Sequence, residues 1–133
     1  MANSKQDFRT PLSRVNGLGS AKSGTEHFWH QRLTAIANIP LALFFVGLVV
    51  ALHDQPFETV QASLASWPVA LGLLALIGSG LIHMRLGMQV IIEDYVHSEF
   101  TKILCLVLNT FFTAAIGLGC VFSILKLAFS AGV

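Results

Sequence analysis

The apolar residues of this chain fall into three long runs that are separated by short polar segments. Neither a charged residue nor a histidine occurs within residues 33–52, 59–82 and 103–125. A helix of roughly 20 apolar residues is long enough to cross the hydrocarbon core of a bilayer. None of the runs has the polar face that a helix of a soluble bundle turns toward water. The pattern therefore predicts an all-α membrane protein with transmembrane helices near residues 33–53, 66–95 and 101–127.

The composition supports this prediction and excludes several other classes of protein. Of the 133 residues, 54% are hydrophobic and only 11% are charged, whereas about 25% is typical of a soluble domain. The formal net charge of +1 does not provide the basic surface that binding to nucleic acid needs. We therefore exclude a soluble enzyme domain and a nucleic-acid-binding protein. Residues 1–25 are predicted to form a polar N-terminal tail, followed by a transmembrane domain over residues 26–133.

The placement of lysine and arginine predicts how the chain is oriented in the membrane, because cytoplasmic segments are enriched in these residues. Six of the eight cations lie in the segment up to Arg32 or at the junction between the second and third predicted helices: Lys5, Arg9, Arg14, Lys22, Arg32 and Lys102. The loop between the first and second helices contains neither lysine nor arginine. We therefore predict a cytoplasmic N-terminus and a periplasmic C-terminus.

His83 is the only one of the five histidines that lies within a long apolar stretch. Ionisable groups at membrane depth are costly and usually functional. The helical repeat places His83 on one face with Ser79, Gly87, Val90 and Asp94. A neutral imidazole there can ligate a haem iron, relay protons or form an interhelical hydrogen bond. The small residues beside it leave room for a flat, bulky group and favour haem over the relay, with the interhelical bond as the structural alternative.

A six-coordinate haem needs two axial ligands, and this chain offers only one at that depth, His83. The other four histidines lie outside the apolar runs: His27, His30, His53 and His97. A bound haem would therefore take its second ligand from another chain, so the residues themselves predict a heteromeric membrane complex.

A second candidate site lies at the predicted cytoplasmic ends of the first two helices. The phenol of Tyr95, which follows Asp94, can donate a hydrogen bond to a carbonyl oxygen such as that of a quinone, or it can anchor the helix in the interfacial aromatic belt. Arg32, with His27 and His30 just before it, can bind haem propionates or a quinone head group, or it can serve as a positive anchor. These alternatives stay open on the residues alone.

Three further residues within the predicted helices are assigned no chemistry. Arg85 points about 200° away from His83 at 100° per residue, so we expect it to make a packing or lipid contact. Cys105 and Cys120 lie in the same predicted helix, about 22 Å apart along its axis. That separation is too large for a disulfide, so we expect both to be packing residues.

Two groups of residues carry a resemblance to a known family. They are Arg32-x-Thr34-Ala35-Ile36 on the first helix and His83-x-x-x-Gly87-Met88, followed by Asp94-Tyr95, on the second. Together they resemble the hydrophobic membrane-anchor protein of succinate dehydrogenase, respiratory complex II. The resemblance covers roughly residues 24–128, and it looks most like the alphaproteobacterial version in segments 17–22, 25–29 and 88–95.

The resemblance implies specific roles for residues of both candidate sites. The two anchor proteins of such a complex bind one haem b between them, so His83 would be this chain's axial ligand to the haem iron. Arg32 and His27 would lie on the propionate side of the haem. Tyr95 would donate a hydrogen bond to a carbonyl of ubiquinone, the substrate, with Asp94 supporting it through a basic residue of a partner.

The resemblance also implies a function and a set of partners. The chain would attach the flavoprotein and iron–sulfur subunits to the bacterial inner membrane as a multi-pass anchor, beside a second anchor of the cytochrome b556 type. It would not oxidise succinate itself, because it has neither a flavin-binding fingerprint nor a cysteine set for clusters. It would contribute to the quinone site of this oxidoreductase. The alternatives are a fumarate reductase-type quinol anchor and a non-catalytic small membrane protein.

Overall fold

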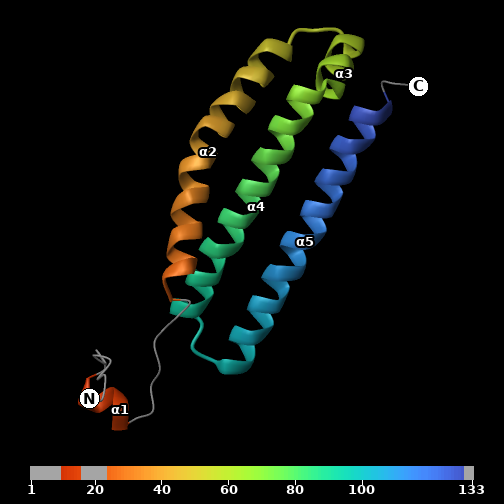
Figure 1. The fold of residues 1–133 in the computed structure, drawn as a ribbon. Helices are drawn as coiled ribbons and strands as arrows, with labels where there is room; N and C mark the ends of the chain where they lie inside the picture. The colour runs from red at the N-terminus through yellow and green to blue at the C-terminus, as the bar shows by residue number, and fades with distance from the viewer. Residues whose placement is uncertain (1–9, 16–23, 131–133) are drawn as a thin grey trace, which may run out of the picture.

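The structure, a computed structural model, describes residues 10–15 and 24–130 of the chain (Figure 1). Within these ranges every regular element is a helix. The helices are α1 (Pro11–Val15), α2 (Gly24–Leu52), α3 (Phe57–Ala65), α4 (Trp67–Tyr95) and α5 (Glu99–Ser130). The all-helical fold class predicted from the sequence is confirmed.

The three long helices run antiparallel, with α4 between α2 and α5 (Figure 1). Small residues allow close contact on both sides of α4. A Cβ atom at Gly72 would lie 2.6 Å from the Phe44 ring of α2, and one at Gly117 of α5 would lie 3.1 Å from Leu81. Helix α4 therefore packs against both of the other long helices.

The apolar surface of the described chain is mostly exposed rather than buried. Its buried hydrophobic residues are Ala65, Ala70, Ile92 and Ala128, while large side chains such as Leu43, Phe111 and Leu118 are exposed. This distribution is unfavourable in water but suits a helix surrounded by lipid or by another membrane chain. Three helices are long and apolar enough to span a membrane: Thr25–Leu52, Trp67–Tyr95 and Glu99–Phe129. The three predicted spans are thus confirmed.

The connection between the first two spans contains a short helix that the sequence pattern did not predict. Helix α3 lies next to the start of α4 and contacts both α4 and α5. At the same end of the layer, the rings of Trp67 and Phe129 meet edge to face, with centroids 5.4 Å apart. Trp67 starts α4, as expected for a tryptophan at the membrane interface.

The first span begins earlier than predicted. Helix α2 starts at Gly24, nine residues before the predicted start, and continues through Pro40. The first two turns carry polar side chains, so hydrophobicity alone does not assign them to a helix. Their backbone groups can still form helical hydrogen bonds at a membrane edge. Most of the predicted tail, residues 1–25, lies outside the described residues. The start of α2 and the end of α4 lie at the same end of the layer (Figure 1).

Candidate functional site

The side chain of His83 on α4 faces α2 and is held there by two contacts. Its Nδ1 atom lies 3.2 Å from Oγ1 of Thr34 and 3.2 Å from the backbone carbonyl oxygen of Gln31. One turn before His83 along α4, the hydroxyl of Ser79 donates to the backbone carbonyl of Thr34 at 3.4 Å. The interhelical hydrogen bond that the sequence left as an alternative is therefore present.

The oxygens around His83 favour one tautomer of its neutral ring. The Thr34 hydroxyl donates to the carbonyl of His30 at 2.7 Å, and a hydroxyl has only one hydrogen to donate. In their contacts with His83, the Thr34 oxygen and the Gln31 carbonyl oxygen therefore accept a hydrogen bond from Nδ1. A neutral imidazole that donates from Nδ1 keeps an unprotonated Nε2. Among the described residues no hydrogen bond reaches this Nε2 atom.

A cavity of about 440 Å³ opens beside His83 between α2 and α4. Its lining residues are His27, Phe28, Gln31, Arg32, Ala35, His83 and Val90. The Nε2 atom of His27 and the Oε1 atom of Gln31 are inaccessible to solvent and have no hydrogen-bond partner. The Arg32 guanidinium lies 4.4 Å above the Phe28 ring, and no ion pair joins it to a described carboxylate. The cavity thus combines an available imidazole nitrogen with donors for an anionic group.

The face of α4 that carries His83 is only partly open. Val90 lines the cavity, as the helical repeat predicts, but Ser79 and Gly87 face α2 rather than empty space. A Cβ atom at Gly87 would lie 3.3 Å from the Gln31 amide nitrogen. Part of the room expected for a bulky group is therefore taken by α2, and the remaining space lies along the α2–α4 edge.

His27 lines the same cavity as His83 but lies nearer the end of the layer. It precedes Thr34, which is level with His83, by seven residues, or about 10 Å along the helix axis. His27 and His83 thus line one cavity at different heights along the layer. Within the described ranges, no group of three His, Cys, Asp or Glu side chains could hold a metal ion.

Asp94 and Tyr95 lie at the end of α4, away from the His83 cavity. Both are exposed, with Tyr95 77% accessible. Neighbouring Glu93 accepts a hydrogen bond from the Gln89 amide at 2.8 Å. Tyr95 follows His83 by twelve residues, or about 18 Å along the helix. The structure therefore does not bring Tyr95 into the His83 cavity, and its phenol projects from the surface.

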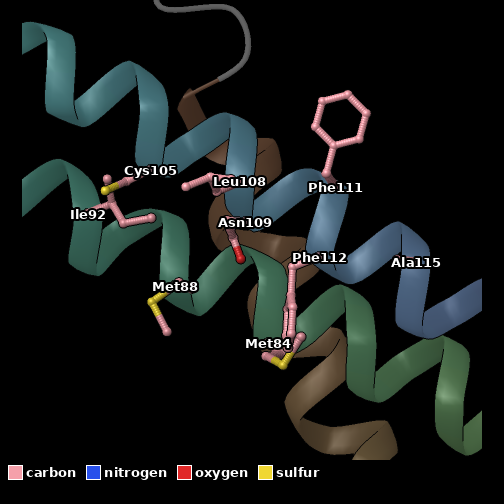
Figure 2. Close-up of a pocket in the computed structure, with 9 residues that line it drawn as sticks. All are labelled: Met84, Met88, Ile92, Cys105, Leu108, Asn109, Phe111, Phe112 and Ala115. Atoms are coloured by element: carbon pink, nitrogen blue, oxygen red, sulfur yellow. The ribbon is translucent and has the colours of Figure 1, made fainter.

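A long apolar groove runs between α4 and α5 (Figure 2). It has a volume of about 700 Å³ and is lined by Met84, Met88, Ile92, Cys105, Leu108, Asn109, Phe111, Phe112 and Ala115. The amide nitrogen of Asn109 donates to the backbone carbonyl of Arg85 at 3.0 Å. The side chain of Arg85 is exposed, in agreement with the prediction that it points away from His83.

Sequence reasoning assigned no role to Thr34 and Gln31, although both contact His83. A signal for them was present in the spacing of polar residues on α2. His27, Gln31, Thr34 and Asn38 recur at intervals of four, three and four, which is one face of a helix. A polar stripe within an apolar helix indicates an interhelical contact, and here it faces α4.

These features define a multi-pass membrane protein with a cavity at the interface of two helices. The sequence model of the family described as "Succinate dehydrogenase/Fumarate reductase transmembrane subunit" matches residues 6–124. The chain belongs to this family, which confirms the resemblance noted from its motifs. It is a multi-pass protein of the inner membrane, with an anchor role in an oxidoreductase complex.

Individual relatives agree with the family assignment. A succinate dehydrogenase hydrophobic membrane anchor subunit of Rickettsia bellii is 34% identical over 90 residues, covering 68% of this chain and 72% of the relative. The succinate dehydrogenase membrane anchor subunit of Reclinomonas americana is 37% identical over 90 residues, covering 65% and 75%. The corresponding Paracoccus denitrificans protein is 30% identical over 88 residues, covering 66% and 68%. No solved structure matches the chain.

Proposed function

We propose that this chain is the anchor subunit of a succinate:ubiquinone oxidoreductase, in which His83 supplies one axial ligand of a haem b. The observation that carries the proposal is the placement of His83 at a cavity, with Nδ1 in contact with two oxygens of α2 and with no hydrogen bond from the described residues to Nε2. Histidine ligands of metals characteristically donate their other ring N–H to a carbonyl or similar acceptor. The Gln31 carbonyl and the Thr34 oxygen supply that interaction here.

The residues around the cavity suit the polar edge of a haem as well as its iron. A haem carries two propionate carboxylates, which pair favourably with guanidinium and imidazole N–H donors. Arg32 and the unpartnered Nε2 of His27 are the donors of this cavity. When bound, the haem would take up and release one electron at a time. Its second axial ligand would come from a partner anchor protein that covers the open side of the cavity.

The second part of the proposal concerns ubiquinone at the end of α4. Reduction of a quinone to a quinol adds two electrons and two protons, one proton on each carbonyl oxygen. The exposed Tyr95 hydroxyl can donate a hydrogen bond to one of these oxygens and so favour the charge that develops there. Asp94, also exposed, would orient a basic residue of a partner. The electrons would come from succinate through the flavoprotein and iron–sulfur subunits.

The orientation of the chain supports this arrangement. The start of α2 and the end of α4 lie at one end of the layer (Figure 1), and this end carries Arg32 and Lys102. The connection over residues 53–66 at the other end has neither lysine nor arginine. By the positive-inside rule, we propose that the Tyr95 end is cytoplasmic, where it meets the catalytic subunits, and that the C-terminus is periplasmic.

Substitution of His83 tests the haem assignment. His83→Leu should abolish the low-spin spectrum of a haem with two histidine ligands in the purified complex. His53→Leu is a matched control, because His53 lies in the connection after α2 and pairs with Asp54 at 2.9 Å. An unchanged low-spin spectrum in His83→Leu would overturn the assignment and favour the non-catalytic alternative, in which His83 only joins two helices.

Substitution of Tyr95 tests the quinone assignment independently. Tyr95→Phe removes only the hydroxyl, so ubiquinone reduction should fall by about tenfold to a hundredfold, while the haem spectrum and dye-linked succinate oxidation are retained. Unchanged ubiquinone turnover would rule the role out. The family description covers fumarate reductases as well, but these relatives are named as succinate dehydrogenase subunits, which favours succinate oxidation as the physiological direction.

A further inference from the structure

We propose that the groove between α4 and α5 binds the polyprenyl tail of the quinone whose head group contacts Tyr95. The inference rests on the proposed function, because it takes the Tyr95 phenol as the contact of the head group. It adds a binding site for the part of the substrate that the phenol does not reach.

The chemistry of the groove suits a long apolar chain rather than a polar ligand. Asn109 is the one amide in its lining, and the nitrogen of that amide already donates to the Arg85 carbonyl. The other lining residues are apolar or weakly polar. Met84 and Met88 contribute flexible thioether side chains, which adapt to irregular and branched apolar surfaces. The groove also lies wholly within the spans Trp67–Tyr95 and Glu99–Phe129, at membrane depth.

The groove extends toward the end of α4 that carries Tyr95. On α4, Met84, Met88 and Tyr95 are related by steps of four and seven residues, so they lie on one helix face. Ile92 and Cys105 lie at one end of the groove, and Met84 and Phe112 lie farther along it (Figure 2). Ile92 precedes Tyr95 by three residues, about 4.5 Å along the axis. The groove thus begins less than one helical turn from Tyr95.

The covalent link between head and tail favours a quinone over a free lipid. A head group held at Tyr95 gives its tail a high effective concentration at the adjacent apolar surface. From Cys105 to Ala115, the groove extends for about 15 Å along α5, which accommodates the first units of a polyprenyl chain. A phospholipid acyl chain has similar chemistry, but no feature of the groove requires its head group to lie at the Tyr95 end.

Two neighbouring alanines of α5 offer a matched pair of variants. Ala115 lines the groove and Ala114 does not, and both are exposed. In the membrane-bound complex, Ala115→Phe should raise the KM for a long-chain ubiquinone by about tenfold, equivalent to losing roughly two buried methylene groups. The KM for the same head group without a tail should not change. Ala114→Phe should leave both values unchanged.

Photolabelling distinguishes the quinone tail from a lipid chain. A ubiquinone analogue with a diazirine near the start of its tail should label Met88, Cys105 or Leu108, and long-chain ubiquinone should compete with this labelling whereas the tail-less head group should not. Labelling confined to other helices, or an equal KM for Ala115→Phe and wild type, would overturn the proposal. So would labelling of the groove by a diazirine phospholipid that long-chain ubiquinone does not displace.

The Tyr95→Phe variant separates this proposal from the function on which it rests. If Tyr95→Phe lowers turnover of both quinones while Ala115→Phe affects neither, the quinone site stands and the tail site is wrong. If Tyr95→Phe affects neither quinone, the proposed quinone role of this chain fails, and the tail site fails with it.

Discussion

Thr34 and His83 are separated by 49 positions in the sequence, yet the Thr34 hydroxyl oxygen lies 3.2 Å from Nδ1 of His83. Because the same hydroxyl donates to the His30 carbonyl at 2.7 Å, it accepts from His83. Together with the Gln31 carbonyl, which can only accept, the contact orients the ring and favours the tautomer with the proton on Nδ1. A ligand that is preorganised in this way loses less freedom when it binds a metal.

Removal of the Thr34 hydroxyl should weaken haem binding without removing the ligand. Thr34→Val keeps the shape of the side chain but takes away one of the two acceptors at Nδ1. Loss of such an outer partner typically lowers metal affinity by about tenfold or more. We expect a lower haem-to-protein ratio and altered g-values in the electron paramagnetic resonance spectrum.

The serine variant separates hydrogen bonding from packing at this position. Thr34→Ser keeps the hydroxyl and should restore both the haem content and the g-values of the wild type. Equal values in Thr34→Val and the wild type would show that the Gln31 carbonyl alone positions His83. A defect of the same size in both variants would point instead to loss of a packed methyl group.

The number of spans was predictable from sequence, whereas the surroundings of His83 were not. Residues 33–52 and 103–125 are long enough to cross a bilayer and carry no charge, so their structural class follows from composition alone. The contacts of His83 depend on which helices pack together and at what height. That choice is made by close fits such as the one between Phe44 and Gly72, which leave no periodic signal in the sequence.

The start of the first span and the short helix α3 were not predicted, for a related reason. The residues of α2 before Leu33 are polar enough to resemble a tail. A turn at the membrane interface can still be helical, because the helix satisfies the hydrogen-bonding needs of its backbone N–H and C=O groups. Most residues of α3 belong to the second apolar run, so hydrophobicity does not distinguish them from α4. Ser66, at the junction between α3 and α4, has extended backbone angles and separates the two helices.

The close contact between Phe44 and Gly72 predicts a strong effect of one added methyl group. In Gly72→Ala the new Cβ would lie 2.6 Å from a ring carbon of Phe44, so the ring or the helix has to move. Overpacking of this kind costs about 1–3 kcal/mol. We expect a lower thermal unfolding midpoint of the solubilised complex, partly restored by the double variant Phe44→Leu/Gly72→Ala.

A second glycine of α4 provides the control for this packing prediction. A Cβ atom at Gly80 would meet nothing within 4 Å, so Gly80→Ala should be neutral or slightly stabilising, because alanine favours a helix more than glycine does. Equal midpoints for Gly72→Ala and Gly80→Ala would contradict the tight packing between α2 and α4.

The hydrogen bond from Asn109 to the Arg85 carbonyl, 3.0 Å long, predicts a smaller effect on the other side of α4. Asn109→Leu removes the donor, and interhelical hydrogen bonds in membranes contribute about 0.6 kcal/mol on average. We expect a modest fall in the unfolding midpoint and an unchanged haem spectrum. Thr110→Val is the control, because the Thr110 hydroxyl bonds within its own helix, to Leu106. A change in the haem spectrum of Asn109→Leu would show that the α4–α5 interface also positions His83.

The charge of Arg32 predicts a shift in the potential of a haem bound at His83. The Arg32 guanidinium lines the cavity and stacks on Phe28, so it would stabilise the reduced haem, which carries one positive charge fewer than the oxidised form. Arg32→Gln should therefore lower the midpoint potential. Coulomb's law at about 10 Å and an effective dielectric constant of about 20 gives on the order of 1–2 kcal/mol, or several tens of millivolts.

Redox titration of the haem absorbance measures this shift in midpoint potential. The control is Arg85→Gln, which removes an exposed charge outside the cavity and should produce a smaller shift. An unchanged or higher potential in Arg32→Gln would exclude Arg32 from the propionate side of the haem.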